Sequence, residues 1–202
     1  MSWTTPRIDT LEARLRSARV VPVIRVGDPV EAEELVARLL EAGLGTIELT
    51  TTIPGWDKVA ASIRDSHPQV SVGIGTILSA GHAREAVAAG ADFCVSPTLV
   101  PGAAGVLQTA DIPLLEGGFT PTEVLDAASR GIAKLFPAHA LGARYLKSLL
   151  AVAPDARIMP TGGIPLSEVQ QWLDAGAIAV GVGSDLTAPG DIGARLAEAL
   201  LA

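Results

Sequence analysis

The stretch TPTEVLDAASRGIAKLF, residues 120–136, contains a helix, a turn and a strand in immediate succession. Thr120 is followed three residues later by Glu123, which is the spacing of a capping box at a helix start. Gly131 is expected to end this helix in a left-handed conformation, as glycine commonly does. The apolar run 132–136 follows at once and predicts a buried strand. The stretch is therefore one helix–strand unit joined by a glycine.

The same unit recurs along the whole chain. Asp28 before Pro29 marks another helix start, with an N-cap and a proline in the first turn. Strands are expected at residues 20–26, 46–50, 70–76, 92–96, 112–115, 132–136, 157–160 and 177–181. Helices are expected at 7–18, 29–42, 55–65, 103–110, 120–130 and 191–201, with three more ending near 89, 150 and 175. Glycines expected to end helices are Gly43, Gly90, Gly131 and Gly176.

This alternation predicts an α/β protein with a closed barrel. Strands that are apolar on both faces are typical of buried parallel sheets. Eight such strands with helices between them, in 202 residues, favour a single (β/α)8 TIM barrel spanning 1–202, with a short N-terminal helix. The alternative is a doubly wound open sheet. That fold would need a Gly-x-Gly-x-x-Gly cofactor turn, and the first turn is Val26-Gly27-Asp28-Pro29 instead.

Composition excludes several classes of partner. The chain is 49% hydrophobic with a formal net charge of −7, which argues against nucleic acid or an anionic membrane as partner. Cys94 is the single cysteine, so neither an intrachain disulfide nor a cysteine-based metal cluster is possible. Residues 1–7 lack the apolar core of a signal peptide, and no run is long enough to span a membrane. A cytoplasmic location is therefore expected.

Polar residues occur near the ends of the predicted strands, where barrel active sites lie. The set is Arg25, Glu48, Thr50, Thr76, Ser96, Lys134, Thr161 and Ser184. Because side chains alternate along a strand, Glu48 shares a face with Thr46 and Thr50, away from Ile47 and Leu49. Lys134 similarly shares a face with Phe136 in its strand. Glu48 and Lys134 are thus both expected to point into the barrel.

Lys134 is the candidate nucleophile. The chain has three lysines and twelve arginines, yet a lysine occupies this apolar strand. A desolvated lysine can lose its proton and become a nucleophilic amine, which arginine cannot. Two other interpretations stay open at this point: a lysine whose stem packs in the strand while its head reaches water, and a structural ion pair with Glu48.

Two glycine clusters follow the last two strands and indicate a phosphate site. They are Thr161-Gly162-Gly163-Ile164-Pro165 and Gly181-Val182-Gly183-Ser184. Barrels often bind phosphate after strands seven and eight, and glycine lets the backbone approach the anion closely. A glycine pair by itself also occurs in ordinary turns. The histidines His67, His82 and His139 lack metal-ligand spacing, so no metal site is expected, and His139 is expected at the mouth of the barrel.

The chain resembles the 2-keto-3-deoxy-6-phosphogluconate (KDPG) aldolase family of class I barrel aldolases over nearly its whole length. The motifs that carry the resemblance lie at residues 20–25, 47–50, 73–76, 95–97, 120–123, 134–137, 160–164 and 181–184. The resemblance implies that Lys134 forms a Schiff base with the keto substrate and that Glu48 is the general acid/base. It further implies that the substrate carboxylate is bound by Arg25, Thr76 and Thr161. Pro97 and Phe136 would form an apolar wall. The phosphate would be bound by Gly162, Gly163, Gly183 and Ser184. The resemblance implies no cofactor. It implies a phosphorylated keto sugar acid and pyruvate as the small-molecule partners, and a homotrimer as the assembly.

The sequence departs from the family pattern at two positions expected to lie at the mouth of the site. Glu116 replaces a proline after the fifth strand, and His139 replaces a glutamate after the lysine strand. Both are possible specificity residues, and Glu116 near Lys134 would favour the ammonium form. Cleavage of KDPG is the leading hypothesis. Alternatives are the galactonate epimer, 4-hydroxy-2-oxoglutarate, a non-covalent phosphosugar isomerase, or a catalytically impaired barrel that binds a phosphorylated metabolite.

Overall fold

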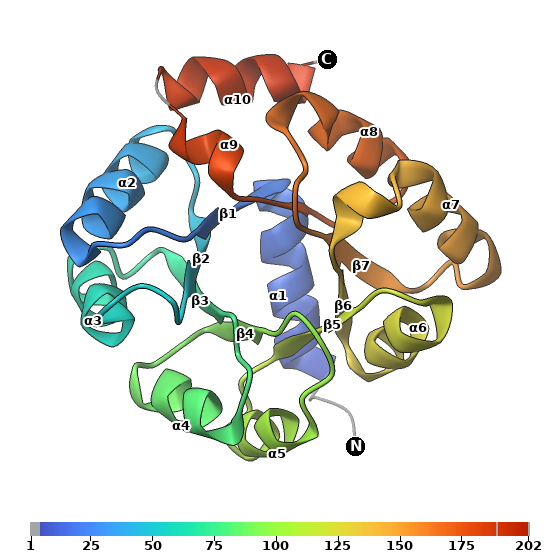
Figure 1. Cartoon of the computed structure of the whole chain (residues 1–202), viewed down its shortest axis with the longest axis horizontal. Helices are drawn as coiled ribbons and strands as arrows, with labels where there is room; N and C mark the ends of the chain where they lie inside the picture. Colours follow the sequence, from blue (N-terminus) through green and yellow to red (C-terminus); the bar gives the residue numbers. More distant parts are fainter. Residues whose placement is uncertain (1–4, 189, 202) are drawn as a thin grey trace.

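In a computed structural model that describes residues 5–188 and 190–201, the protein is a (β/α)8 barrel. Eight parallel strands form one sheet in the order β7-β6-β5-β4-β3-β2-β1-β8. A parallel bridge between Thr161 and Gly181 joins β7 to β8, so the sheet closes on itself. The helices that follow the N-terminal one form an outer ring around it (Figure 1). The predicted barrel is confirmed, and its outermost residues, 1–4 and 202, lie outside the described residues.

The strands are short and run in sequence order around the barrel. They are β1 (Val20–Ile24), β2 (Thr46–Thr50), β3 (Ser71–Gly75), β4 (Phe93–Val95), β5 (Leu114–Gly118), β6 (Ile132–Leu135), β7 (Arg157–Pro160) and β8 (Val180–Val182). The α-helices are α1 (Thr5–Ala18), α2 (Pro29–Glu41), α3 (Trp56–Ser66), α4 (Ala80–Ala88), α5 (Pro101–Thr109), α6 (Pro121–Arg130), α7 (Ala143–Val152), α8 (Val169–Asp174), α9 (Ser184–Thr187) and α10 (Ile192–Leu201). Two single 3₁₀ turns, Ala138–Ala140 and Leu166–Glu168, precede α7 and α8.

The strand register decides which side chains enter the barrel. Glu48 of β2 lies level with Val23 of β1 and Gly73 of β3. Across the barrel, Lys134 of β6 lies level with Gly117 of β5 and Met159 of β7. Because the side-chain period of a strand is two, this register points Glu48 and Lys134 inward and their sequence neighbours toward the helices.

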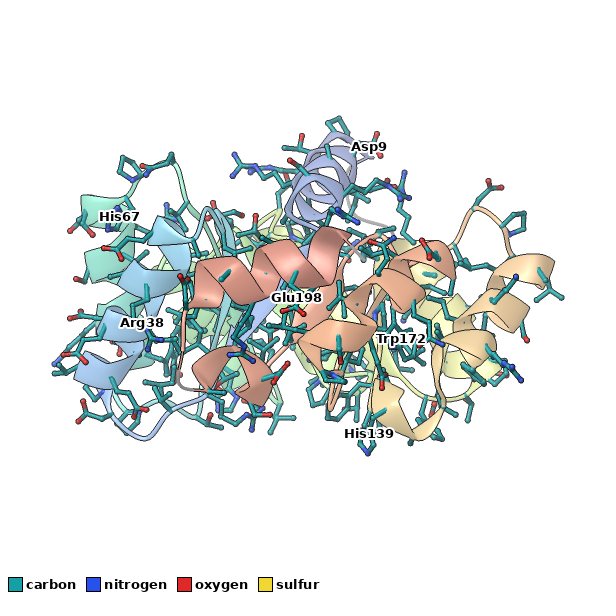
Figure 2. The ribbon with its side chains drawn as sticks, turned by 90° about the horizontal axis from the view of Figure 1, so that it is seen from above. Asp9, Arg38, His67, His139, Trp172 and Glu198 are labelled. Carbon is teal, nitrogen blue, oxygen red and sulfur yellow. The ribbon has the colours of Figure 1, made fainter. Side chains whose placement is uncertain are left out.

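Helix α1 covers the end of the barrel opposite the expected site. Its Leu11 and Leu15 are buried. Arg157 at the start of β7 pairs with Asp9 at 2.8 Å and with Glu12 at 2.6 Å, which fixes the helix to the barrel. Figure 2 shows Asp9 on α1 at one side of the molecule and His139 at the opposite side. The face that carries His139 is therefore the carboxyl-terminal face of the strands.

The sequence placed two strands incorrectly. The fifth strand is Leu114–Gly118 rather than 112–115, and the eighth is Val180–Val182 rather than 177–181. Glycines 117 and 118 have little intrinsic strand preference, but each pairs with a residue of β6. Tertiary pairing thus overrides local propensity at both positions. The short helix α9 after β8 was not expected.

Three of the four predicted glycine caps are confirmed. Gly43, Gly90 and Gly176 have φ values of 88°, 74° and 103°. Gly131 is the exception, because its φ of 166° is extended backbone and its N–H bonds to the carbonyl of Ala128. Any residue adopts that φ, so the left-handed cap predicted for Gly131 is wrong.

Almost all of the strand surface is buried in the core. Charged and polar residues buried among the described residues are Thr46, Glu48, Thr50, Ser71, Ser96, Glu116, Lys134 and Thr161. Among these, Glu48 and Lys134 are the inward-facing charged residues. No helix in the described part of the chain is both long and apolar enough to cross a membrane.

The capping box of α6 gives a test of local stability. The Thr120 side chain accepts from the N–H of Glu123, and the Glu123 carboxylate accepts from the N–H of Thr120 at 2.9 Å. We expect Thr120→Ala to lower the free energy of unfolding by about 1 kcal/mol, measured by denaturant titration. Thr120→Ser retains the acceptor and should stay within a few tenths of a kcal/mol. Equal losses in both variants would contradict the capping role.

Candidate active site

Lys134 and Glu48 face each other inside the barrel. The Lys134 Nζ lies 3.8 Å from the Glu48 Oε1, and their side chains are 6% and 1% exposed. Lys134 comes from β6 and Glu48 from β2, so the closed barrel brings them together from distant strands. The Nζ also lies 5.1 Å from the centroid of the Phe136 ring. The predicted inward orientation of both side chains is confirmed.

Glycines on the neighbouring strands make room for the Glu48 carboxylate and for the backbone after β4. A Cβ at Gly75 would collide with the Glu48 carboxylate. A Cβ at Gly117, level with Lys134, would collide with the backbone of Pro97. The barrel interior at this level therefore requires glycine because functional side chains and a loop occupy the space that a methyl group would take.

Burial changes the proton affinity of the lysine. The pKa of Lys134 is lowered from its ordinary range chiefly because desolvation disfavours the ammonium form. The Glu48 carboxylate opposes this shift by raising the pKa of Lys134, while the guanidinium of Arg25 lowers it further. A lowered pKa increases the fraction of neutral, nucleophilic amine near neutral pH.

The Glu48 carboxylate has no hydrogen-bond donor within the described residues. Both of its oxygens are buried, and neither accepts a hydrogen bond. A buried carboxylate without hydrogen bonds destabilises the folded state unless a ligand or a water molecule donates hydrogen bonds to it. The pair with Lys134, at 3.8 Å, exceeds normal hydrogen-bond length. The arrangement leaves the carboxylate oxygens beside the amine as unused acceptors.

Arg25 and Thr76 form a second polar group beside the lysine. The Arg25 Nη2 donates to the Thr76 hydroxyl at 3.2 Å. Thr76 has a φ of 62°, a left-handed conformation that is unfavourable for a β-branched residue. The Thr51 hydroxyl donates to the Thr76 carbonyl at 2.9 Å, which helps to hold this backbone in place. Strain of this kind is commonly found where a side chain must be aimed at a ligand.

Thr161 presents a further unused polar group. Its hydroxyl is buried and has no partner among the described residues, and a Cβ at Gly181 would collide with it. Gly181 therefore leaves space that the hydroxyl occupies. Phe136 lies beside Gly162, and Pro97 follows β4 at the same end of the barrel. The residues predicted to bind the keto acid thus lie on one face of the molecule.

The glycine turns after β7 and β8 are neighbours because their strands are joined by the bridge between Thr161 and Gly181. Gly162 and Gly163 have φ values of 99° and 69°, a conformation that favours glycine. The N–H groups of Gly163 and Gly183 donate no hydrogen bond within the part of the chain that the structure describes. These donors are available to an anion, and Ser184 follows as an exposed residue at the start of α9.

His139 lies against the first of these turns. Its backbone N–H donates to the Gly162 carbonyl at 3.1 Å, and its Nδ1 lies 3.1 Å from the same oxygen. A Cβ at Gly163 would approach the His139 ring to 2.6 Å. The position expected for His139 at the mouth is confirmed.

The position expected for Glu116 is wrong. Glu116 lies on the face of β5 that points toward the helices, level with Ala133 rather than with Lys134. Its Oε2 accepts from Arg130 of α6 at 2.6 Å and 2.9 Å. The sequence assigned it to a loop because the predicted strand ended at residue 115, three residues before the end of β5. Glu116 is a structural ion-pair residue and does not adjust the protonation of Lys134.

Two other strand-end residues have structural partners. The Thr50 hydroxyl donates to the Ile24 carbonyl at 2.9 Å, and the Ser96 hydroxyl donates to the Thr98 carbonyl at 2.7 Å. No cluster of three or more metal-ligating side chains is present in the described residues. Sequence reasoning missed the roles of Gly75 and Gly181. The alternate spacing of Gly73 and Gly75 within one strand was the available signal, because it places two glycines on one face.

Comparison with known proteins assigns the family. The family model for KDPG and KHG aldolase matches residues 11–196. The chain belongs to this family. A 2-dehydro-3-deoxy-phosphogluconate aldolase of Haemophilus influenzae is 33% identical over 176 residues, covering 86% of this chain and 82% of the relative. A 2-dehydro-3-deoxy-6-phosphogalactonate aldolase of Escherichia coli is 28% identical, covering 89% of each chain.

A solved relative bears on the chemistry of KDPG and KHG aldolases. The KDPG aldolase of Legionella pneumophila, in a structure with pyruvate captured at low pH as a covalent carbinolamine intermediate, is 26% identical to this chain. The similarity covers 94% of this chain and 96% of that one, with a TM-score of 0.81. Named members of this family are thus aldolases, which are carbon–carbon lyases.

The electrostatic environment of Lys134 gives a prediction that is independent of turnover. In protein carrying ¹³C-labelled lysine, NMR titration should place the midpoint of Lys134 below the ordinary value of about 10.4. Arg25→Met should raise this midpoint, because a nearby positive charge is removed, and Glu48→Gln should lower it further. Lys58 and Lys147 are exposed and provide internal reference signals. Shifts of the same sign in the two variants would contradict the assigned geometry.

Proposed function

We propose that this protein is a class I aldolase that cleaves KDPG to pyruvate and glyceraldehyde 3-phosphate. The observation that carries the proposal is the desolvated amine of Lys134 facing the unpartnered carboxylate of Glu48 inside the barrel. A lysine with a lowered pKa is the nucleophile that Schiff-base chemistry requires. The opposed carboxylate supplies an acceptor for the proton that must leave the substrate hydroxyl.

The reaction begins at the keto carbon. The neutral Lys134 amine adds to that carbon to give a carbinolamine, which loses water to form an iminium ion. Glu48 then removes the proton from the C4 hydroxyl, directly or through water, and the C3–C4 bond breaks. Its electron pair moves into the iminium to give an enamine, while the aldehyde product leaves. Protonation of the enamine and hydrolysis of the imine release pyruvate and restore the amine. No metal or organic cofactor takes part.

The carboxylate of the keto acid is assigned to Arg25, Thr76 and Thr161. The guanidinium supplies a positive charge, and the unpartnered Thr161 hydroxyl supplies a donor close to the lysine strand. Phe136 and Pro97 form the apolar wall that excludes water from the reacting carbon. Exclusion of water protects the iminium from premature hydrolysis.

The phosphate is assigned to the turns at Gly162–Gly163 and Gly183–Ser184. The available N–H groups of Gly163 and Gly183 support this assignment, and positive φ values at residues 162 and 163 allow close approach of the backbone. His139 packs on the first turn and is the candidate specificity residue. Glu116 has no place in this assignment because its carboxylate is bound to Arg130.

The galactonate epimer is the second candidate substrate. The similarity to the Escherichia coli phosphogalactonate aldolase over 89% of both chains favours it. The two substrates differ at one stereocentre, so the Schiff-base chemistry is common to both. Unphosphorylated 4-hydroxy-2-oxoglutarate is a further candidate, since the family description includes KHG aldolase. A cytoplasmic homotrimer is part of the proposal, and light scattering after size exclusion tests the oligomeric state.

Borohydride trapping tests the covalent step. Incubation with pyruvate followed by reduction should give one stable adduct, and peptide mass spectrometry should locate it on Lys134. Lys134→Arg retains the positive charge but cannot form an imine, so it should give no adduct. Trapping at Lys58 or Lys147 instead, or unchanged turnover in Lys134→Arg, would contradict the proposed mechanism and favour a non-covalent isomerase or a binding protein.

The role of Glu48 is tested separately from that of the amine. Glu48→Gln should lower kcat on the preferred substrate by about 10²- to 10⁴-fold because proton transfer from the hydroxyl loses its acceptor. Trapping of pyruvate by borohydride should persist, since imine formation uses the Lys134 amine. Initial rates on the two epimeric phosphorylated acids and on 4-hydroxy-2-oxoglutarate then identify the substrate. Full activity in Glu48→Gln would exclude it as the general base.

A further inference from the structure

The two glycine turns assigned to phosphate are connected by a side chain that the motifs do not include. The Asp185 Oδ2 accepts a hydrogen bond from the backbone N–H of Leu166 at 2.7 Å. Leu166 lies three residues after Gly163, and Asp185 lies two residues after Gly183. This hydrogen bond therefore spans the turn after β7 and the turn after β8.

The other side of the Asp185 carboxylate is fixed by Arg195 of α10. The Arg195 Nη2 lies 3.0 Å from the Asp185 Oδ1 and donates to the Asp185 backbone carbonyl at 2.7 Å. The two side chains are 28% and 35% exposed, so solvent screens them only in part. Arg195 thus restrains both the carboxylate and the backbone of the second turn. Charge-assisted hydrogen bonds of this kind are stronger than neutral ones.

Apolar packing does not fill the space beside this pair. A cavity of about 350 Å³ lies next to Asp185 and Arg195, bounded by Leu166, Glu198 and Ala199 among others. The hydrogen bond from Leu166 to Asp185 lies at the edge of this space and adds a second link between the two turns, beyond the backbone bridge between Thr161 and Gly181. On its other side, the first turn is held by the N–H groups of Ala138 and His139, which donate to the carbonyls of Thr161 and Gly162.

We propose that Asp185 is a positioning residue that sets the separation of the two glycine turns and thereby determines affinity for the phosphate group of the substrate. This inference rests on the phosphate site of the proposed function. An unpaired carboxylate so near the site would repel phosphate, and Arg195 offsets that charge. Asp185 therefore acts through its position. One carboxylate oxygen accepts the hydrogen bond from Leu166 in the first turn, and the other is paired with Arg195 of α10.

The proposal requires a selective kinetic effect. Asp185→Ala should raise KM for the phosphorylated keto acid by about tenfold, the equivalent of one net hydrogen bond. The inhibition constant of inorganic phosphate against that substrate should rise by a similar factor. The kcat, the kinetics of the unphosphorylated keto acid and the trapping of pyruvate on Lys134 should all change by less than about twofold, because the barrel interior is untouched.

Two further variants and a control separate positioning from general stability. Arg195→Met keeps the Asp185 carboxylate but removes its restraint and its counter-charge, so it should give a selective loss at least as large as that of Asp185→Ala. Asp185→Asn retains one acceptor for Leu166 and should give a smaller loss. Glu198→Gln removes a negative charge beside the same cavity and should leave the phosphate inhibition constant unchanged. If Asp185→Ala does not fold, Arg195→Met and Asp185→Asn carry the test.

The outcomes distinguish this inference from the proposed function. If the unaltered enzyme prefers the phosphorylated substrate and the variants lower phosphorylated and unphosphorylated turnover equally, the positioning role of Asp185 is wrong while the proposed function stands. An unchanged phosphate inhibition constant in Asp185→Ala would likewise show that the positioning role of Asp185 is wrong, while the proposed function stands. If the unaltered enzyme neither prefers phosphorylated substrate nor is inhibited by phosphate, the phosphate site itself is wrong, and this inference fails with it.

Discussion

The structure depends on keeping an amine and a carboxylate inside a barrel that is otherwise apolar. Burial of both groups is expensive, because neither the 3.8 Å ion pair nor any protein donor fully replaces the water that Glu48 loses. An uncharged pair of apolar residues would stabilise the same interior more simply. Desolvation is also what lowers the pKa of Lys134, and this favours the neutral amine that the proposed reaction requires.

The closed sheet makes this arrangement possible. Glu48 and Lys134 lie on strands separated by β3, β4 and β5 in the sheet, and only closure of the barrel directs them toward each other. Gly75 leaves the space that the Glu48 carboxylate occupies, and Gly117 leaves space for the backbone of Pro97. Helix α1 closes the opposite end and is held by Arg157, so the carboxyl-terminal face is the proposed side of substrate entry. The buried core and the approach of Glu48 to Lys134 thus follow from the same closure.

The chemistry is divided between rigid strands and loops. The proposed reacting groups come from β2 and β6, whose backbone is fixed by hydrogen bonds on both sides. The phosphate is assigned to turns, which have no such ladder and depend on side-chain contacts such as that of Asp185 with Leu166. In barrels of this kind the strand residues determine the reaction, and the turns after the strands determine which substrate is bound. The substrate can therefore differ between such barrels while the reaction stays the same.

The sequence by itself determined the class of fold and the inward faces of β2 and β6, because the alternation of helices and strands and the side-chain period of a strand are local patterns. The rarity of lysine in an apolar strand made Lys134 the candidate nucleophile, and the roles proposed for Glu48 and for the binding residues came from the resemblance to the aldolase family. The tertiary structure alone decided that Glu116 pairs with Arg130, that Gly131 is extended, and that Asp185 joins the two turns. Each of these depends on strand register or on contacts between elements distant in sequence. A shift of register by one residue turns every side chain to the other face of a strand, and no local pattern around the two glycines of β5 fixes that register.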